Sequence, residues 1–446
     1  MKKFIETIKN IWSIEDLRNR ILTTLLLVLV YRVGSYITLP GLDPNELAKF
    51  SESSQQGILG LFNMFAGGSF SRASIFALGI MPYISASIAI QLLTIAVPYF
   101  QKLQKEGDSG RKKINQYTRL LTVIVTAFQA SAYVAYLRTQ SGGALIPAYG
   151  GFMFWLSTTV VLTAGTLFVM WLGEKITDKG IGNGTSIIIM TGILARLPES
   201  LLQEFALRTG GGGGLLIFLV ELAMFILITI GLILLVQGTR KIPVNYAKRI
   251  VGNKQYGGVR QFIPLKVNAA GVMPIIFAQA IMFIPATAIG FATQSENASG
   301  FIRIFSDHTN PWYNVIYAVL VVVFTFFYTA LIFNPSQMAD EMKRNNGFIP
   351  GVKPGKSTAD YIGAVMDRIT LPGSVFLAVV GIMPGIAAAL GVNTGFSTFF
   401  GGTSLLIMVG VILDTLQQIE SQLLMRHYDG LMSSGRIKGR TSPANA

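Results

Sequence analysis

Residues Gly214–Gln237 read GLLIFLVELAMFILITIGLILLVQ, and Glu221 is the one charged side chain among them. About 20 helical residues cross the ~30 Å hydrocarbon core of a bilayer, so this stretch predicts a membrane-spanning helix. The whole chain agrees: of 446 residues, 51% are hydrophobic and 13% are charged, whereas about a quarter of a soluble protein is charged. The sequence therefore predicts an integral membrane protein and excludes an ordinary soluble enzyme, a disordered chain and a fibrous one.

Apolar stretches of similar length recur along the chain and give ten candidate spans. They cover residues 21–38, 74–97, 118–138, 152–172, 183–197, 214–237, 268–291, 312–333, 371–390 and 403–420. The stretches 183–197 and 371–390 are short or interrupted by Gly and Pro, so we expect them to border protein rather than lipid. The predicted fold class is an all-α polytopic membrane protein with ten transmembrane helices.

The distribution of Lys and Arg predicts the orientation, because these residues are enriched in cytoplasmic loops. Of the 36 Lys and Arg, 29 lie in the N-terminal segment, in alternate loops and in the C-terminal tail, and seven lie on or near the other side. We therefore expect both termini in the cytoplasm and an even number of spans. The net charge of +14 then reflects topology, and we predict no DNA partner.

The residue counts also narrow the chemistry. There are no cysteines and two histidines, so we predict no disulfide, no metal site and no cofactor. The first apolar run begins late and lacks a cleavage pattern, so it is predicted to be a true span and not a signal peptide. Before it, residues 1–20 place apolar side chains at helical spacing between charges, which is typical of a helix in the membrane interface.

Two pairs of motifs repeat between the first five spans and the last five. Gly79–Ile84 (GIMPYI) in the second span matches Gly271–Ile276 (GVMPII) in the seventh, and Gly184–Ile189 (GTSIII) opens the fifth span as Gly402–Ile407 (GTSLLI) opens the tenth. Because five is odd, the two halves run through the membrane in opposite directions, as in many transport proteins. The alternative is chance similarity in Gly-rich apolar sequence, with Gly-Thr-Ser as a helix cap.

The repeat predicts where a central pathway is narrowest. If the motifs correspond, their last isoleucines lie at matching depths around a common axis, with one further isoleucine a turn earlier in the second span. The predicted ring consists of Ile80, Ile84, Ile189, Ile276 and Ile407. A ring of branched aliphatic side chains is a hydrophobic constriction, which closes by excluding water and offers no site for a particular solute.

The segment 57–72 (GILGLFNMFAGGSFSR) precedes the second span and is too short to cross the membrane. It is apolar enough to be buried, and we expect the pair Gly67-Gly68 to act as a hinge. Such a half-helix can fold back into an outer funnel and leave it again; the alternative is a re-entrant segment packed permanently on the rim. The residues singled out here are Gly57, Ile58, Leu61, Phe62, Asn63, Met64, Phe65, Gly67, Gly68, Phe70 and Arg72.

Few groups inside the spans could perform chemistry. Arg32 and Glu221 lie near enough to the outer ends to reach water, and no chain of Asp, Glu and His crosses the bilayer as a proton relay would. Uncharged polar residues in the second, third and seventh spans could loosen the seam between helices, or simply form interhelical hydrogen bonds. They are Gln91, Gln129, Asn268 and Gln279.

Two long basic loops, 238–267 and 334–370, are predicted on the cytoplasmic side as exposed protrusions. Their charged residues include Arg240, Lys241, Lys248, Arg249, Lys254, Lys353 and Lys356. Such loops suit an acidic protein surface or ribosomal RNA, and the alternative is charge that only fixes topology. Gly351–Ser357 (GVKPGKS) has three residues where a phosphate loop needs four, so the energy for transport must come from a partner or from the membrane potential.

Longer strings carry a resemblance to a known family. They are Ala73–Ile88 (ASIFALGIMPYISASI), Gly180–Gly184 (GIGNG), Asn245–Arg249 (NYAKR), Pro264–Asn268 (PLKVN), Phe327–Leu331 (FYTAL) and Gly401–Ser404 (GGTS). With them the chain resembles, over nearly its whole length, the SecY family of channel subunits of the bacterial general protein translocase. One departure is Lys353, where the family usually has Arg; lysine keeps the charge but loses the planar fork.

The resemblance implies ten helices in two inverted halves around an hourglass pore, a plug formed by 57–72, and a pore ring on the five isoleucines above. It also implies a lateral gate, with the second and third spans on one side and the seventh and eighth on the other. The residues that we place at this gate are Ser87, Gln91, Gln129, Asn268 and Gln279. The predicted organisation is a cytoplasmic segment 1–20, an N-terminal half 21–197, an external linker 198–213, a C-terminal half 214–420 and a cytoplasmic tail 421–446.

The function implied is a protein-conducting channel in the bacterial inner membrane that passes unfolded secretory polypeptides and releases transmembrane segments sideways into lipid. The implied partners are SecE and SecG, the SecA ATPase or the ribosome, and secretory preproteins with their signal sequences. The rival hypothesis is a secondary solute transporter, which needs coordinating polar groups at the midplane, where this sequence has isoleucines. An intramembrane enzyme is disfavoured, because no nucleophile with a base and no metal pair stands out within the spans.

Overall fold

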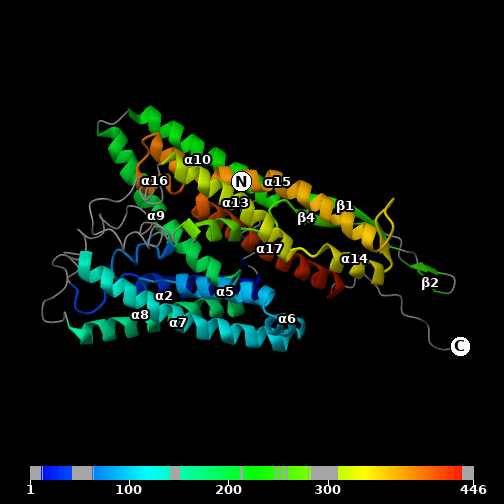
Figure 1. The fold of residues 1–446 in the computed structure, drawn as a ribbon, viewed down its shortest axis with the longest axis horizontal. Coiled ribbons are helices and arrows are strands. Elements are labelled where there is room, and N and C mark those ends of the chain that lie inside the picture. Colours follow the sequence, from blue (N-terminus) through cyan, green and yellow to red (C-terminus); the bar gives the residue numbers. More distant parts are fainter. Residues whose placement is uncertain are drawn as a thin grey trace. The chain divides into compact units, whose positions relative to one another are not determined.

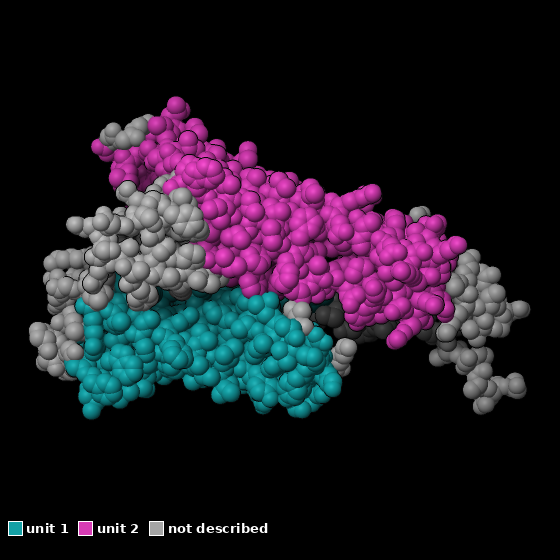
Figure 2. Space-filling model, in the orientation of Figure 1, with its two compact units in different colours: residues 1–196, 411–446 teal, residues 197–410 magenta. Residues whose placement is uncertain are grey.

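The computed structural model describes residues 12, 14–42, 63, 65–140, 151–210, 214–246, 249–251, 254–256, 260–279, 281–282 and 310–433. The chain divides into two compact units (Figure 2). Unit 1 is Met1–Arg196 with Val411–Ala446, and unit 2 is Leu197–Gly410. Two long helices, α9 (Gly184–Thr209) and α17 (Gly402–Ser433), each contribute residues to both units.

Unit 1 is built from long helices (Figure 1). Besides its parts of α9 and α17 it contains α2 (Glu15–Gly34), α5 (Met81–Ala96), α6 (Pro98–Lys105), α7 (Asp108–Gln140) and α8 (Phe152–Lys179). α7 packs along both α5 and α8, and α2 packs along α8. A Cβ atom on Gly165 of α8 would collide with the carbonyl group of Ile75, so glycine is needed for α8 to lie against this backbone.

The turn-rich segment 66–80 is part of the core of unit 1. Its buried residues Phe70, Ala73 and Leu78 cluster with Tyr133 of α7 and Leu162 of α8. Burial of a large apolar side chain contributes about 1.5–3 kcal/mol, so the segment is anchored by packing although it is neither helix nor strand.

Unit 2 combines membrane-length helices with a small sheet. Its elements are α10 (Gly214–Gln237), β1 (Thr239–Tyr246), β2 (Arg249–Val251), β3 (Lys254–Tyr256), β4 (Arg260–Lys266), α13 (Pro311–Ile332), α14 (Pro335–Arg344), β5 (Gly347–Phe348), α15 (Lys356–Ala389) and α16 (Thr394–Ser397). α13 packs along α15. The β2–β3 hairpin continues beyond the end of the β1–β4 pair (Figure 1).

The three-stranded sheet has the order β4-β1-β5, and both of its contacts are antiparallel. Its inner face buries side chains of the first basic loop against side chains of the second: Ile242, Val244 and Leu265 against Met342, Ile349, Ile362 and Met366. The backbone N–H of Val267 donates to the carbonyl oxygen of Gly238 at 2.9 Å. Because hydrogen-bonded pairs alternate along an antiparallel ladder, Pro243 and Pro264 fall in pairs where no N–H is needed between β1 and β4.

Seven described helices are long and apolar enough to cross a membrane, or eight if the bent pair Met81–Thr94 and Pro98–Gln104 forms one span. The multi-pass helical fold is confirmed. α10 covers the predicted span 214–237 residue for residue. The count of ten spans stays a prediction, since residues 283–291 of the predicted seventh span lie outside the described residues.

Two helices are longer than the sequence suggested. The prediction that Gly and Pro interrupt the span at 371–390 is wrong, because α15 continues through Pro372 and Pro384 to Ala389. α9 passes Pro198 and runs to Thr209, so most of the predicted linker 198–213 is helical. Helices in a membrane tolerate proline because neighbouring groups can satisfy the freed carbonyls.

Candidate functional site

The two members of the first repeated motif adopt the same local structure. Gly79 and Gly271 both have positive φ, 54° and 64°, in the left-handed region that favours glycine. A helix begins two residues after each of them, with proline in its first turn, where no N–H is needed. α9 and α17 both begin at the first glycine of their motif, Gly184 and Gly402. The first motif is therefore repeated in the local backbone as well as in the sequence, whereas in the second motif Gly402 has a positive φ of 65° that Gly184 does not share.

The structure describes all five ring isoleucines, which are divided between Ile80, Ile84 and Ile189 in unit 1 and Ile276 and Ile407 in unit 2. In unit 1, Ile80 caps the start of α5 and is 2% exposed. In unit 2, the Thr403 hydroxyl donates to Oε1 of Gln279 at 3.4 Å. These partners lie one turn from Ile407 and Ile276 respectively, so the bond joins the two helical segments beside both isoleucines. The complete ring stays a prediction.

Six of the predicted plug residues are described: Asn63, Phe65, Gly67, Gly68, Phe70 and Arg72. The others, Gly57, Ile58, Leu61, Phe62 and Met64, lie outside the described residues. Gly67 and Gly68 have φ values of +63° and +84°, so the predicted hinge pair forms a turn that other residue types disfavour. The side-chain oxygen of Asn63 accepts from the backbone N–H of Ser71 at 3.1 Å, which ties together the two sides of this turn.

Hydrogen bonds to two helices hold the segment in unit 1. Nη1 of Arg32, on α2, donates to the carbonyl oxygen of Gly67 at 3.2 Å. The Tyr133 hydroxyl, on α7, donates to the carbonyl oxygen of Phe70 at 2.7 Å. Tyr133 is buried, and a buried tyrosine hydroxyl needs a partner. The segment thus has fixed partners at the glycine pair and after it.

A third helix touches the segment through its backbone. A Cβ atom built on Gly192 of α9 would lie 2.9 Å from the carbonyl oxygen of Phe65 and 3.2 Å from the backbone N of Gly67. Gly192 lies one turn after the ring residue Ile189, so the segment packs on α9 close to the predicted constriction. Sequence reasoning did not single out Gly192; its signal was a lone glycine inside a long helix, which often marks a close backbone approach.

The predicted gate residues are divided between the units. Ser87 and Gln91 lie one turn apart on α5, and Gln129 is half-buried on α7, the helix packed along α5. Asn268 lies in the turn after β4, and Gln279 belongs to the helical segment that contacts Thr403. The prediction that Asn268 is inside a span is wrong, because its helix begins after the left-handed turn at Gly271. The gate as a whole stays a prediction.

The two basic loops, predicted as protrusions, form one folded body. β5 of the second loop pairs with β1 of the first, with Asn245 opposite Phe348. Four predicted docking residues are exposed on this body, Arg240 and Lys241 on β1 and Lys353 and Lys356 beside the start of α15. Lys248 lies outside the described residues, and Arg249 and Lys254 lie on β2 and β3, where the structure describes the backbone alone.

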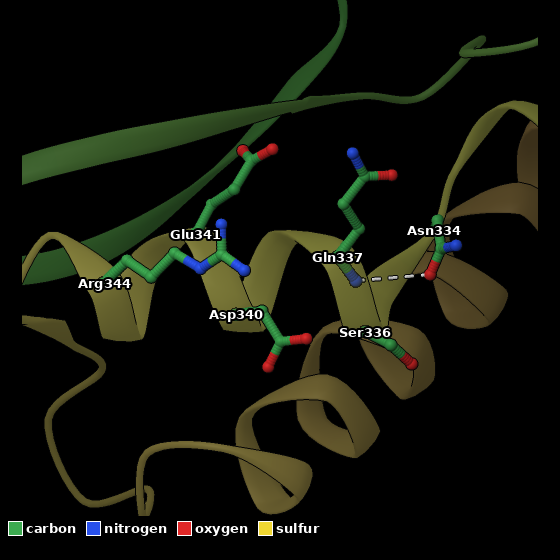
Figure 3. Close-up of a pocket in the computed structure, with 6 residues that line it drawn as sticks. All are labelled: Asn334, Ser336, Gln337, Asp340, Glu341 and Arg344. Atoms are coloured by element: carbon green, nitrogen blue, oxygen red, sulfur yellow. Dashed lines mark hydrogen bonds between the residues drawn. The ribbon is translucent and has the colours of Figure 1, made fainter. Parts of the chain in front are cut away.

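A polar pocket of about 370 Å³ lies beside α14 on the same body (Figure 3). Its described lining is Asn334, Ser336, Gln337, Asp340, Glu341 and Arg344. Asn334 caps the helix by accepting from the backbone N–H of Gln337 at 3.3 Å. Figure 3 shows Gln337 and Glu341 on one side of α14 and Ser336 and Asp340 on the other. Across the described part of the chain, no three His, Cys, Asp or Glu residues are grouped to hold a metal ion.

A buried ion cluster in unit 2 was not predicted. Arg208 donates to Glu204 at 2.9 Å, to Glu221 at 2.6 Å and to the carbonyl oxygen of Gly391 at 2.8 Å. Glu204 also accepts from the backbone N–H of Asn393 at 2.9 Å. Glu221 is 7% exposed, so the prediction that it reaches water is wrong. The cluster connects α9 and α10 to the segment between α15 and α16. Its contacts are expected to be maintained, because a buried carboxylate without a nearby cation is strongly destabilising.

The sequence of this chain is similar to those of known proteins over most of its length. The SecY family model matches residues 74–416. The protein translocase subunit SecY of Thermus thermophilus is 43% identical over 439 residues, which cover 97% of this chain and 99% of that protein.

The fold is similar to those of solved channel structures. One, described as a protein conducting channel, has a TM-score of 0.63 at 16% identity, and another, Sec61 in the canine ribosome-channel complex from the endoplasmic reticulum, has 0.60 at 16%. A third, which concerns the plug domain of a SecY protein in the closed channel, has 0.56 at 17%. Each comparison covers 91% of this chain and 92% of the other. At these identities the likeness shows the fold alone.

Proposed function

This chain belongs to the SecY family, and on that basis we propose that it conducts unfolded secretory polypeptides across the bacterial inner membrane, with both of its termini in the cytoplasm. The observation that carries the proposal is the 43% identity to a protein translocase subunit over almost the whole of both chains. The family is one of translocation channels, and we expect the chain itself to catalyse no reaction.

The physical requirement is a pore that passes any sequence and leaks few ions. An extended polypeptide cannot cross hydrocarbon, because each unpaired peptide group costs several kcal/mol, so it needs water-filled funnels on both sides of the membrane. Only a thin waist can be dry. Aliphatic side chains there close around a passing chain without hydrogen-bonding to it, which makes transport indifferent to sequence. The ring Ile80, Ile84, Ile189, Ile276 and Ile407 fits this role.

We propose two moving parts. The segment 57–72 is the plug that backs the ring when the channel is idle; its glycine turn and its contacts with α2, α7 and α9 support this role. The lateral gate opens beside Ser87, Gln91 and Gln129 on one side and Gln279 on the other. An apolar signal sequence entering the gate would partition into lipid.

Uptake by proteoliposomes tests the function. We expect a secretory precursor to become protected from protease when the partner ATPase and ATP are added, and small solutes not to accumulate under an ion gradient. The same precursor without its signal sequence is the control and should stay accessible. Solute uptake without precursor import would instead support a secondary transporter.

We further propose that the folded body formed by the two basic loops, 238–267 and 334–370, is the docking surface for the SecA ATPase or the ribosome. We also propose that SecE and SecG are the membrane partners. Side chains alternate along β1, so Lys241 points away from the core that contains Ile242. The same outer face carries Phe262, which is opposite Pro243, and Phe348, and both phenylalanines are exposed. A basic face with exposed aromatics suits an acidic protein surface or RNA.

Charge reversal tests the docking surface. The triple variant Arg240→Glu, Lys241→Glu and Lys353→Glu should weaken ATPase binding by about tenfold or more at low salt, because like charges then oppose the partner. Binding of labelled ATPase to proteoliposomes measures the effect, and Arg138→Glu, which reverses one exposed charge on α7, is the control. Unchanged binding of the triple variant, at low and at high salt, would show that the partner docks elsewhere.

A further inference from the structure

Two arginines converge in unit 1 on a single carbonyl group. Nη1 of Arg32 and Nη2 of Arg72 both donate to the carbonyl oxygen of Gly67, at 3.2 Å and 2.9 Å. Their guanidinium carbons also lie 5.6 Å and 4.2 Å from the centre of the Tyr36 ring. No carboxylate of the described residues lies within 4.0 Å of either guanidinium. Two positive charges are therefore held together without a countercharge among the described residues.

The arrangement leaves donors available. A guanidinium has five N–H groups in a planar fork, and each of these two arginines gives one of them to Gly67. A carbonyl dipole and an aromatic face offset part of the repulsion between like charges, but neither carries a negative charge. Both side chains are half-buried, where solvent screens them less than in open water. An anion that accepts from both forks would complete the site.

The surroundings indicate which anion this is. α2 exposes an apolar stripe at helical spacing that consists of Leu22, Leu25, Leu26, Leu29 and Val33. In a membrane-spanning chain such a stripe faces acyl chains. The stripe ends at Tyr36, which is 59% exposed, and an exposed tyrosine at a helix end is typical of the headgroup level. The two guanidiniums lie over that tyrosine ring, which places them at the level expected for lipid phosphates if α2 crosses the membrane as the sequence predicts.

We propose that Arg32 and Arg72 bind the phosphate of an anionic phospholipid. The two planar forks donate to the phosphate oxygens, as guanidiniums do in other phosphate sites, and the acyl chains lie along the stripe of α2. The bound lipid supplies a negative charge that the described residues do not provide at this site. Because the same guanidiniums hold Gly67, binding also stabilises the turn at Gly67 and Gly68.

Lipid titration followed by native mass spectrometry tests the site. The full chain in a neutral detergent is titrated with phosphatidylglycerol, with phosphatidylcholine and with inorganic phosphate. We expect phosphatidylglycerol adducts to form about tenfold more readily than phosphatidylcholine adducts, and Arg32→Gln or Arg72→Gln to remove that preference, since each charge-assisted contact of this kind is worth about one factor of ten. Arg138→Gln is the control: Arg138 donates to the carbonyl oxygen of Gly151 at 2.9 Å and should keep the preference.

Other results of the titration would overturn the proposal. Equal adduct formation with both lipids, or an unchanged preference in both glutamine variants, would overturn the site. Tight binding of inorganic phosphate without a preference for phosphatidylglycerol would show a free-anion site and overturn the lipid assignment. Arg32→Lys and Arg72→Lys keep the charge and lose the fork, so they should retain part of the preference. The thermal unfolding midpoints of the variants show whether a lost preference for phosphatidylglycerol comes from unfolding of the protein.

Discussion

Replacing Ile80, Ile84, Ile189, Ile276 and Ile407 together with serine is expected to raise the ion conductance of the resting channel by at least about tenfold. A waist lined by isoleucine excludes water, and ions cross it only by losing hydration. Serine is smaller and carries a hydroxyl group, so the waist fills with water and the barrier falls. Conductance across planar bilayers at a fixed voltage measures the change. The leak matters to the cell, since each charge moving down 100 mV dissipates about 2.3 kcal/mol.

The matched control for the serine variant replaces the same five positions with leucine. Leucine keeps the apolar surface and nearly the same volume, so conductance should stay close to that of the parent protein. Unchanged conductance in the serine variant, with the protein still inserted and its thermal unfolding midpoint preserved, would mean that the seal is not at these residues. The structure describes the five in two separate units, so this measurement tests whether they act together.

Local patterns predicted the elements in which a single physical requirement dominates. Gly214–Gln237 became α10 residue for residue because an unbroken apolar run of that length satisfies its backbone only as a helix in a bilayer. The motif glycines Gly79 and Gly271 both adopt a left-handed backbone conformation, because the same residues at the start of each helix impose the same steric requirement. The glycine pair at 67 and 68 has the left-handed φ values that favour glycine, and its action as a hinge stays a prediction.

Pairings between distant residues could not be predicted in this way. The two basic loops form one sheet because Asn245 lies opposite Phe348, and no pattern within either loop contains that register. Glu221 was predicted to reach water because the sequence gives only its depth in α10; its partner Arg208 is on another helix. Proline was taken to interrupt the span at 371–390 because its local cost is visible in the sequence, whereas the packing that lets α15 continue is tertiary.

Gly192→Val is expected to loosen the plug segment from α9 and raise resting conductance. The new Cβ atom would lie 2.9 Å from the carbonyl oxygen of Phe65 and 3.2 Å from the backbone N of Gly67, and backbone atoms cannot swing aside as a side chain can. Overpacking of this kind costs about 1–3 kcal/mol. If the segment leaves its place, that strain shifts its closed-to-open equilibrium by about 5- to 150-fold. Efflux of a small anion from proteoliposomes measures the leak.

Leu194→Val is the control, because it puts the same β-branched residue on α9 at an exposed position, where we expect no added leak. The pair of variants also separates the two interpretations of the segment. If the segment is a displaceable plug, strain at Gly192 moves it out of its closed position. Conductance then rises while the helices stay folded. If the segment is packed permanently on the rim, it has no alternative position that relieves the strain. The same strain would then lower the thermal unfolding midpoint and leave conductance unchanged. The second result would refute the plug, whatever the serine substitutions in the ring had shown.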